Sequence, residues 1–345
     1  MTPALPAALA AWGSGASGRP YELLADRRDG TVVRCGDTVA KAHAGDADGE
    51  ALALRLRIAG ADALAGVLLP PLRTGSLQGR PVSLWPYGTP VDPERPEDAP
   101  WEAAARLLAA LHRTPPDAVP GPVPPMRGPA KLARALRRLT RALPAAHRTE
   151  PGAAPPHPVP DPREHPRPPV PAVALPHPPP EHPRAARAVL AAAATLPRWA
   201  RGEAVAPPGG ALCHGDLHLG QLVRHPAPVG PWRLIDVDDL GLGTPAWDLA
   251  RPAAWYAAGL LAPEAWLRFL DAYRAAGGPA AGPPGTDPWP ELDLAARALT
   301  VQGAALALSK AATARRPLDG AERLMVESCA RIATLPPELA PHPPS

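Results

Sequence analysis

The chain has 345 residues, a formal net charge of +3 and a sequence pI near 9.0, and its 46% hydrophobic content includes only 4% aromatic residues. This length fits one large or two modest domains, with a helix-rich core built from small side chains. The basic residues are scattered among acidic ones without interleaved aromatic residues, and no stretch is long and apolar enough to span a bilayer, so we expect no nucleic-acid partner and no membrane partner.

The N-terminal sequence and the cysteine content both indicate the cellular location of the protein. No Lys or Arg precedes Arg19, so the N-terminus lacks the basic start of a signal peptide. The three cysteines, Cys35, Cys213 and Cys329, are far apart and form no CxxC pair, which is typical of reduced thiols. We therefore expect a cytoplasmic protein; the sequence does not indicate its oligomeric state.

The first ninety residues have the pattern of a small antiparallel sheet with one inserted helix. Residues 21–43 contain three β-rich runs separated by turn residues. Residues 46–64 then have helical spacing, and 67–88 return to strands with a hairpin near Gly75–Gly79. The sequence therefore predicts an N-terminal lobe over residues 1–88.

The remainder of the chain is predicted to be mainly helical. Helical patterns begin at Trp101, continue over residues 129–147 and 185–200, and occupy most of the chain after Thr244. We expect residues 89–340 to form a larger C-terminal lobe. The predicted fold class is thus α+β, with a sheet lobe followed by a helical lobe.

A proline-rich insertion interrupts the helical part over residues 148–184. Within it, residues 151–184 hold 15 prolines in 34 residues, which excludes a helix or a central strand. Several histidines recur beside these prolines, but a solvated low-complexity segment explains them better than a metal-binding tract does. We expect this insertion to be disordered.

The motif HGDLHLGQ (214–221) admits more than one kind of chemistry. His214, Asp216 and His218 alternate, as the ligands of a metallohydrolase could. Such a site needs further ligands, for which His225 and Asp236 are available, but no recognisable spacing pairs them. A metallohydrolase is therefore an alternative with incomplete support.

A second alternative is a dinucleotide site at GLGTPA (241–246), a G-x-G-x-x-A pattern between a strand and a helix. Three carboxylates, Asp236, Asp238 and Asp239, directly precede it and would repel a pyrophosphate. No earlier βαβ unit supplies the parallel sheet that this reading requires.

A phosphotransferase site accounts for the candidate residues in both the predicted sheet and the acidic loops. Phosphoryl transfer needs a cation near the phosphates, metal ligands, a carboxylate facing the acceptor hydroxyl and a dry cleft. Lys41 is one of only three lysines against 33 arginines, and Glu50 follows on the predicted helix, where it could pair with Lys41. Asp216 is the candidate acceptor-facing carboxylate, while Gln221 and Asp236 offer oxygen ligands to Mg²⁺.

The stretches LCHGDLHLGQLV and RLIDVDDLGLGTPAWDLA, within residues 211–250, resemble the phosphotransferase family that includes aminoglycoside phosphotransferases. The resemblance implies a protein-kinase-like two-lobed fold and ATP as phosphate donor. By position it makes Asp216 the catalytic aspartate, Asp236 a metal ligand and Asp248 a structural aspartate beneath the catalytic loop. It also matches Lys41 and Glu50 to the phosphate-binding lysine and its partner.

Three further residues are interpreted in the light of this resemblance. The family usually has Asn where Gln221 stands; the glutamine amide oxygen can serve the same metal, as in the similar HGDLHLGQ form of maltokinases. His214 is expected to support the loop through backbone contacts. The hinge LWPYG (84–88) should meet adenine through its backbone, and because Pro86 has no N–H, Tyr87 is the expected donor.

The acceptor is predicted to be a hydroxyl group of an aminoglycoside-like antibiotic, a sugar or an amino alcohol. A cationic antibiotic would need an acidic rim, for which four residues are candidates: Asp238, Asp239, Glu264 and Asp271. A rival hypothesis is a pseudokinase-like module that binds nucleotide without turnover. The single Gly30 in the loop over residues 25–31 slightly favours this rival, and the intact Asp216 and Asp236 oppose it.

Overall fold

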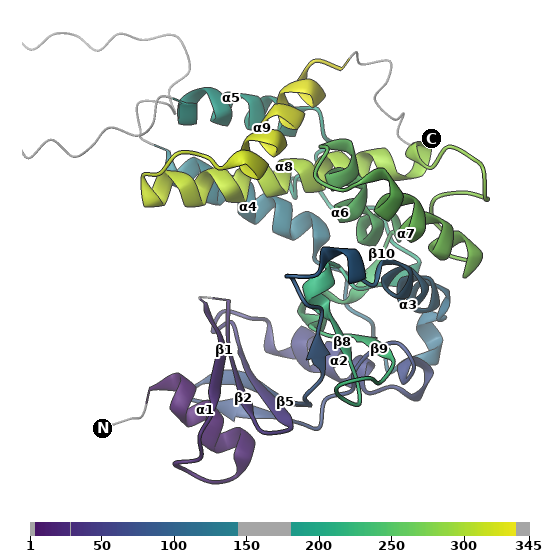
Figure 1. Cartoon of the computed structure of the whole chain (residues 1–345). Helices are drawn as coiled ribbons and strands as arrows, with labels where there is room; N and C mark the ends of the chain where they lie inside the picture. The colour runs from purple at the N-terminus through teal and green to yellow at the C-terminus, as the bar shows by residue number, and fades with distance from the viewer. Residues whose placement is uncertain (1–3, 28, 144–180, 336–345) are drawn as a thin grey trace, which may run out of the picture.

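The computed structural model describes residues 4–27, 29–143 and 181–335, and places a five-stranded antiparallel sheet beside a larger helical region (Figure 1). The strand order is β1-β2-β3-β5-β4. The strands are β1 (Glu22–Arg27), β2 (Gly30–Cys35), β3 (Thr38–His43), β4 (Arg73–Leu77) and β5 (Arg80–Pro86). The three N-terminal strands and the β4–β5 hairpin lie where the sequence predicts them.

Two helices flank this sheet and belong to different cores. Helix α1 (Leu5–Ser14), which the sequence analysis did not predict, packs on β2 and β3, where Leu9 joins a small apolar cluster with Val33 and Val82. Helix α2 (Gly49–Ala59) instead contributes its apolar face to the larger core of the helical region. The sheet and the helical region are therefore joined through α2.

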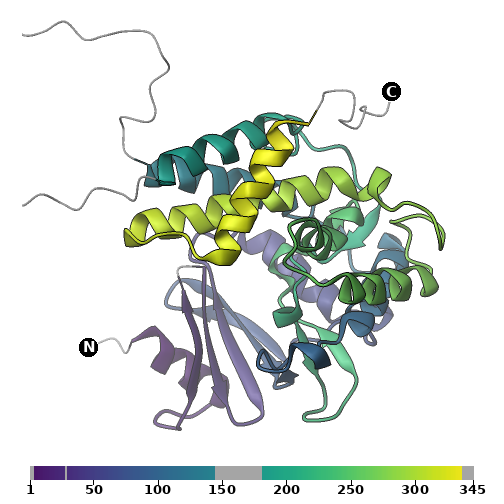
Figure 2. The ribbon, with the colours of Figure 1, turned by 45° about the horizontal axis from the view of Figure 1, so that its top comes forward.

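The helical region is organised around one long helix, α8. Helices α4, α5, α6 and α9 all pack against α8, while α7 packs on α3 (Figure 2). Their bounds are α3 (Trp101–Arg113), α4 (Gly128–Ala142), α5 (Glu181–Ala194), α6 (Ala246–Ala257), α7 (Pro263–Ala275), α8 (Trp289–Ala314) and α9 (Gly320–Ala333). Alanine lines many of these contacts, which agrees with the predicted core of small side chains.

Five short strands position two loops beside each other. Strand β7 (Ala211–Cys213) pairs with β10 (Gly241–Gly243), and β8 (Leu222–Arg224) pairs with both β9 (Trp232–Leu234) and β6 (Thr89–Pro90). Because the loop from β7 to β8 and the loop from β9 to β10 share paired strands at both ends, they are held side by side. Turns of 3-10 helix occur in both loops, at Leu219–Gln221 and Val237–Asp239, and elsewhere at Asp62–Leu64, Pro96–Asp98 and Pro116–Ala118.

The structure revises two points of the sequence analysis. The predicted insertion over residues 148–184 lies outside the described residues, except for 181–184, which form the first turn of α5 rather than part of a disordered segment. His182 in that turn is buried, and its Nε2 lies 3.0 Å from the carbonyl oxygen of Arg316. The dinucleotide alternative is wrong, because Gly241–Gly243 forms an antiparallel strand and the sheets of the described residues lack the parallel βαβ arrangement.

Within the described part of the chain, the helices are all too short or too polar to cross a lipid bilayer.

Candidate functional site

A cavity of about 1140 Å³, counting the part open to solvent, lies between the five-stranded sheet and the two short loops. Its polar lining comes from the sheet, the segment after β5 and the two loops; these residues are Glu22, Arg34, Lys41, Tyr87, Gln221, Asp236 and Asp238. Its apolar walls are formed by Val32, Val39, Leu69, Val223 and Ile235. A half-apolar cleft with a few converging polar groups is the usual form of a small-molecule site.

Lys41 projects from β3 into this cavity and binds two carboxylates of the β9–β10 loop. Its Nζ lies 2.6 Å from Oδ1 of Asp236 and 3.0 Å from Oδ2 of Asp238. Burial alone would lower the pKa of Lys41, but the two carboxylates outweigh it and raise the pKa above its ordinary value. The ammonium is therefore charged throughout the physiological range, and residues 195 positions apart converge on one site.

The predicted pairing of Lys41 with Glu50 is wrong in this structure. Glu50 is exposed in the first turn of α2, next to the N-cap Asp48, and forms no ion pair with a described residue. The buried charged residue of α2 is Arg55, which donates to the carbonyl oxygens of Leu240 and Pro125. Glu50 lies about 140° around the helix from Arg55, so packing of the Arg55 face turns Glu50 toward solvent.

A chain of hydrogen bonds connects the hinge strand to the partner of Lys41. Trp85 Nε1 donates to Ser83 Oγ at 2.8 Å, Ser83 Oγ lies 2.7 Å from His43 Nε2, and His43 Nδ1 lies 3.1 Å from Asp238 Oδ2. The first three side chains are buried. When Ser83 donates to Nε2, Nδ1 carries the proton and donates to Asp238. The sequence analysis missed His43, although it lies two residues after Lys41 and therefore on the same face of β3.

Asp216 lies in the β7–β8 loop with a cation on each carboxylate oxygen. Oδ2 lies 2.6 Å from Lys131 Nζ on α4, and Oδ1 lies 2.6 Å from Arg251 Nη2 on α6. Burial alone would raise the pKa of Asp216, but Lys131 and Arg251 together hold it below its ordinary value. Lys131 also lies 2.8 Å from Asp239, which links Asp216 to the neighbouring loop. The rarity of lysine in this chain was the one sequence signal that could have identified Lys131.

Asp248 supports the Asp216 loop from below. Its carboxylate accepts the backbone N–H groups of His214 at 2.6 Å and Gly215 at 2.7 Å. Gly215 has a φ of +81°, and a Cβ there would collide with the carbonyl oxygen of Asp239, so this position requires glycine. His214 in turn donates from Nε2 to the carbonyl oxygen of Ile235 at 2.8 Å, beside Asp236. This arrangement is what the predicted supporting roles of Asp248 and His214 require.

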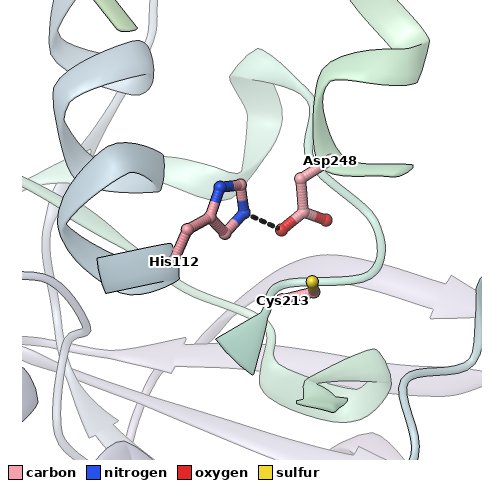
Figure 3. Close-up of side chains that lie close together, drawn as sticks. All are labelled: His112, Cys213 and Asp248. Atoms are coloured by element: carbon pink, nitrogen blue, oxygen red, sulfur yellow. Dashed lines mark hydrogen bonds and ion pairs between the residues drawn. The ribbon is translucent and has the colours of Figure 1, made fainter. Parts of the chain in front are cut away.

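His112, which the sequence analysis did not identify, completes this support (Figure 3). Its Nε2 lies 3.0 Å from Oδ2 of Asp248, and its Nδ1 lies 2.8 Å from the hydroxyl of Tyr273. Cys213 lies close enough to His112 and Asp248 for the three side chains to surround an ion. The polar atoms of Asp248 and His112 are already hydrogen-bonded, however, and burial raises the pKa of the Cys213 thiol well above its ordinary value. The group therefore fits a structural network better than a metal centre, which needs a thiolate.

The metallohydrolase alternative is not supported by the loop geometry. Among the described residues, three potential metal ligands converge at His112, Cys213 and Asp248. His214, Asp216 and His218 do not form such a cluster. His214 contacts a carbonyl oxygen, and His218 Nδ1 accepts the N–H of Gly220 at 3.1 Å. Burial and, to a smaller extent, the positive charge of Arg251 lower the pKa of His218 to about 4. Its ring is therefore neutral near pH 7.

Asp236 and Gln221 lie together on the wall of the cavity. Gln221 is buried, and its Nε2 donates to Oδ2 of Asp236 at 3.2 Å. Asp236 has a φ of +64°, a left-handed conformation that non-glycine residues rarely adopt and that is found more often at functional sites. A carboxylate and an amide offer oxygen donors of the type that Mg²⁺ prefers, so the residues present fit this ion.

The predicted role of Tyr87 as the backbone donor to adenine is contradicted. Its N–H donates to the carbonyl oxygen of Asp37 at 2.7 Å, and its carbonyl oxygen lies 3.1 Å from His225 Nδ1. The N–H of Tyr87 is therefore already hydrogen-bonded to the turn between β2 and β3 and is not free to bind adenine. The next residue, Gly88, also lines the cavity, and its N–H has no hydrogen bond to a described residue.

The predicted acidic rim is not available at this site. Asp238 is bound by Lys41 and His43, and Asp239 is bound by Lys131 and by Arg127, whose Nε lies 3.5 Å away. The other two candidates, Glu264 and Asp271, are exposed on α7. The carboxylates closest to Asp216 are therefore already neutralised by side chains of the protein.

Comparison with known proteins gives a consistent result. Residues 9–292 match the family model described as APH, phosphotransferase enzyme family. Comparison with curated protein sequences gives no significant match. Among solved structures, the chain is similar to a thermostable mutant of aminoglycoside phosphotransferase APH(4)-Ia in ternary complex with AMP-PNP and hygromycin B, at 13% identity and a TM-score of 0.56, covering 96% of this chain and 98% of that chain.

Two kinases are similar to the same degree. One is a choline/ethanolamine kinase family protein from Mesorhizobium loti, at 18% identity and a TM-score of 0.52, covering 92% of this chain and 90% of that chain. The other is an ethanolamine kinase from Plasmodium vivax, at 10% identity and a TM-score of 0.50, covering 94% of this chain and 85% of that chain. At these identities the similarity establishes the fold, and the predicted two-lobed kinase-like architecture is confirmed.

Proposed function

Because the chain belongs to the phosphotransferase enzyme family, we propose that it transfers the γ-phosphoryl group of ATP to a hydroxyl group of a small molecule, with Mg²⁺ as its metal cofactor. The observation that carries this proposal is the convergence of Lys41, Gln221 and Asp236 on one cavity, with Asp216 in the loop that also supplies Gln221. These are the kinds of groups that phosphoryl transfer requires: a cation, oxygen ligands for a metal ion and a carboxylate near the acceptor.

The nucleotide would occupy the cavity between the sheet and the loops. Val39 and Ile235 offer apolar surface for a base, and the N–H of Gly88 replaces that of Tyr87 as donor to the adenine edge. Lys41 lines the same cavity, and its ammonium would contact phosphate oxygens. In this assignment residues 1–88 form the nucleotide-binding lobe and residues 89–340 the catalytic lobe.

Asp236 and Gln221 would hold the metal ion. When bound there, Mg²⁺ would neutralise charge on the phosphate oxygens during transfer. Asp236 is bound by Lys41 in the structure, so the carboxylate must exchange part of this contact for the ion. Lys41 would keep Asp238 as a partner in that state, and Gln221 would present its amide oxygen after rotation of the side-chain amide.

Asp216 would orient the acceptor hydroxyl and receive its proton late in the reaction. The acceptor oxygen forms a bond to the γ-phosphorus while the bond from that phosphorus to the β,γ-bridging oxygen breaks, which releases ADP. Lys131 and Arg251 keep Asp216 ionised and fix its two oxygens. Because the transition state is loose, positioning and charge neutralisation contribute more than strong base catalysis.

The proposal is tested by measuring ADP release and phosphorylated product with purified protein, ATP, MgCl₂ and a panel of hydroxylated acceptors. We expect turnover with at least one acceptor, and a loss of about 10²- to 10⁴-fold in kcat for Asp216→Asn. Asp271→Asn, an exposed aspartate on α7, is the matched control and should retain full activity.

Two outcomes would contradict the proposal. Binding of ATP without turnover on any acceptor would favour a pseudokinase-like module instead. Turnover that persists in Asp216→Asn at the wild-type rate would remove the assigned role of Asp216 even if the chain is a phosphotransferase.

A further inference from the structure

One face of helix α4 carries only positive charges, and this face extends from Asp216 along the helix. Between Asp117 and Glu150 the chain has no acidic residue. On and just before α4, five basic residues recur at intervals of three or four, which places them on one face of the helix. This basic face comprises Arg127, Lys131, Arg134, Arg138 and Arg141.

The basic face is anchored in the candidate active site at its N-terminal end. Arg127 contacts Asp239, and Lys131 contacts both Asp239 and Asp216. A different face of α4, with Leu132 and Leu139 fully buried, packs against α8. The helix is therefore fixed by its apolar face while its basic face begins at the carboxylate of Asp216.

The next basic residue also faces the cleft. Partial burial and then Arg127 lower the pKa of Arg134, while Asp239 and the N-terminal-lobe residue Asp46 raise it. Arg134 therefore lies within electrostatic range of the β9–β10 loop and of the sheet lobe. Arg134 and Arg138 form no ion pair with a described residue, which leaves their guanidinium groups available to a ligand.

The charge of this region does not suit a cationic acceptor. Three cationic side chains, Arg127, Lys131 and Arg251, contact Asp216 or Asp239, and Arg134 lies within electrostatic range of Asp239. Arg138 follows on the same face of α4. A polyamine-like antibiotic would meet more cationic side chains than free carboxylates here, of which the exposed Asp46 is one, and would be repelled. A negatively charged group would instead be attracted, and guanidinium groups bind carboxylates and phosphates with a matching geometry.

We propose that the acceptor of this enzyme is an anionic alcohol, whose carboxylate or phosphate group binds the basic face of α4 while its hydroxyl group meets Asp216. This inference rests on the proposed phosphotransferase function and names its substrate class. Lys131 belongs to the basic face and contacts Asp216, so it would determine which hydroxyl of the acceptor reaches the phosphate.

The experiment measures binding separately from turnover, so that failure of the two proposals can be distinguished. Calorimetric affinities are determined in the presence of ADP and MgCl₂ for two sets of small alcohols, each with anionic, neutral and cationic members. The first set is gluconate, glucose 6-phosphate, glucose and glucosamine; the second is glycerate, glycerol 3-phosphate, glycerol and 2-amino-1,3-propanediol. The carboxylate and phosphate members also show which anion the site prefers.

We expect an anionic member to bind more tightly than its neutral and cationic counterparts, by a margin that shrinks with added NaCl. The double variant Arg134→Gln/Arg138→Gln should weaken that binding by about tenfold, since each exposed charge contributes less than ~1 kcal/mol. Arg106→Gln, an exposed arginine on α3, is the matched control and should bind all ligands like wild type. Affinity for ADP should be unchanged in both variants.

The inference is overturned if no anionic member binds more tightly than the neutral member of its set. It is also overturned if the cationic members bind best, or if RNA oligonucleotides bind the basic face tightly while small alcohols show no charge preference. ATP turnover with a neutral or cationic acceptor would leave the phosphotransferase function standing and refute the substrate class alone.

Discussion

The ammonium of Lys41 lies 3.0 Å from the carboxylate of Asp238, two residues after the proposed metal ligand Asp236. The partner that steadies the proposed phosphate-binding lysine therefore comes from the loop that holds the proposed metal ligand and not from helix α2. Lys41 also contacts Asp236 at 2.6 Å, so one short loop supplies both of its carboxylates. Ordering of this single loop would prepare the lysine and the metal site together.

The first prediction compares the two acidic residues that could serve Lys41. Asp238→Asn should raise the KM for ATP by about tenfold or more, because a charge-assisted contact to the ammonium is lost. Glu50→Gln should leave the KM for ATP unchanged, because Glu50 is exposed and unpaired with any described residue. Steady-state kinetics of the two variants decide the matter. Equal effects would show that α2 rotates to engage Lys41 when nucleotide binds.

The second prediction concerns His43, which connects Asp238 to the hinge strand. His43→Ala removes the group between Ser83 and Asp238 and should raise the KM for ATP by several-fold, with a smaller change in kcat. His43→Asn, whose amide can replace part of the hydrogen bonding, should recover part of that affinity. A loss of thermal stability without any change in ATP affinity in His43→Ala would reduce His43 to a packing role.

The sequence predicted the parts of this site that depend on local pattern. Alternation within a strand places Lys41 on one face of β3, and the strand–loop–strand spacing brings Gln221 and Asp236 together. The predicted role of Glu50 was wrong because the rotation of α2 is set by long-range contacts of Arg55 with Leu240 and Pro125. Such contacts leave no periodic signal in the chain.

Two other features of the site could not be predicted from the sequence, because they also depend on long-range contacts. The amide of Tyr87 is used by Asp37, a partner fixed only when β3 and β5 pair. The role of Lys131 requires α4 to meet the β7–β8 loop, which is 85 residues later in the chain. Helix α1, by contrast, lacks a side-chain N-cap, an acidic first turn and a basic last turn, so its sequence carries few of the usual helix signals.

The third prediction uses the cations on Asp216. Because Lys131 and Arg251 hold the pKa of Asp216 below its ordinary value, loss of Lys131 should raise that pKa. The acid limb of the kcat profile should therefore move toward neutral pH in Lys131→Gln, since the proposed role of Asp216 requires its ionised form. Wild-type kcat should be flat where the variant begins to fall. An unshifted acid limb would show that Asp216 does not control the rate at low pH.

The fourth prediction concerns the support beneath the catalytic loop. Asp248→Asn replaces one acceptor oxygen by an amide that cannot accept the N–H groups of both His214 and Gly215. Leaving a buried donor unpaired should lower the free energy of unfolding by about 2–4 kcal/mol. Denaturant titration measures this change. Cys213→Ala, in the same buried group, is the control; its thiol makes one weak contact at 3.7 Å, so a comparable loss there would assign the effect to packing.

The fifth prediction follows from the neutral state of His218. Its pKa is about 4 in the folded protein and near 6.5 in an unfolded chain. Between these values the unfolded chain binds more protons, so the free energy of unfolding should fall as the pH falls from 6.5 to 4, and this contribution is complete above 6.5. His218→Gln should flatten that part of the stability profile while leaving stability at pH 8 nearly unchanged. Thermal unfolding of both proteins across this range measures the difference, and NMR titration of the His218 ring locates its pKa directly. A ring that titrates near 6.5 in the folded protein, together with parallel stability profiles, would refute the burial of a neutral His218 beside Arg251.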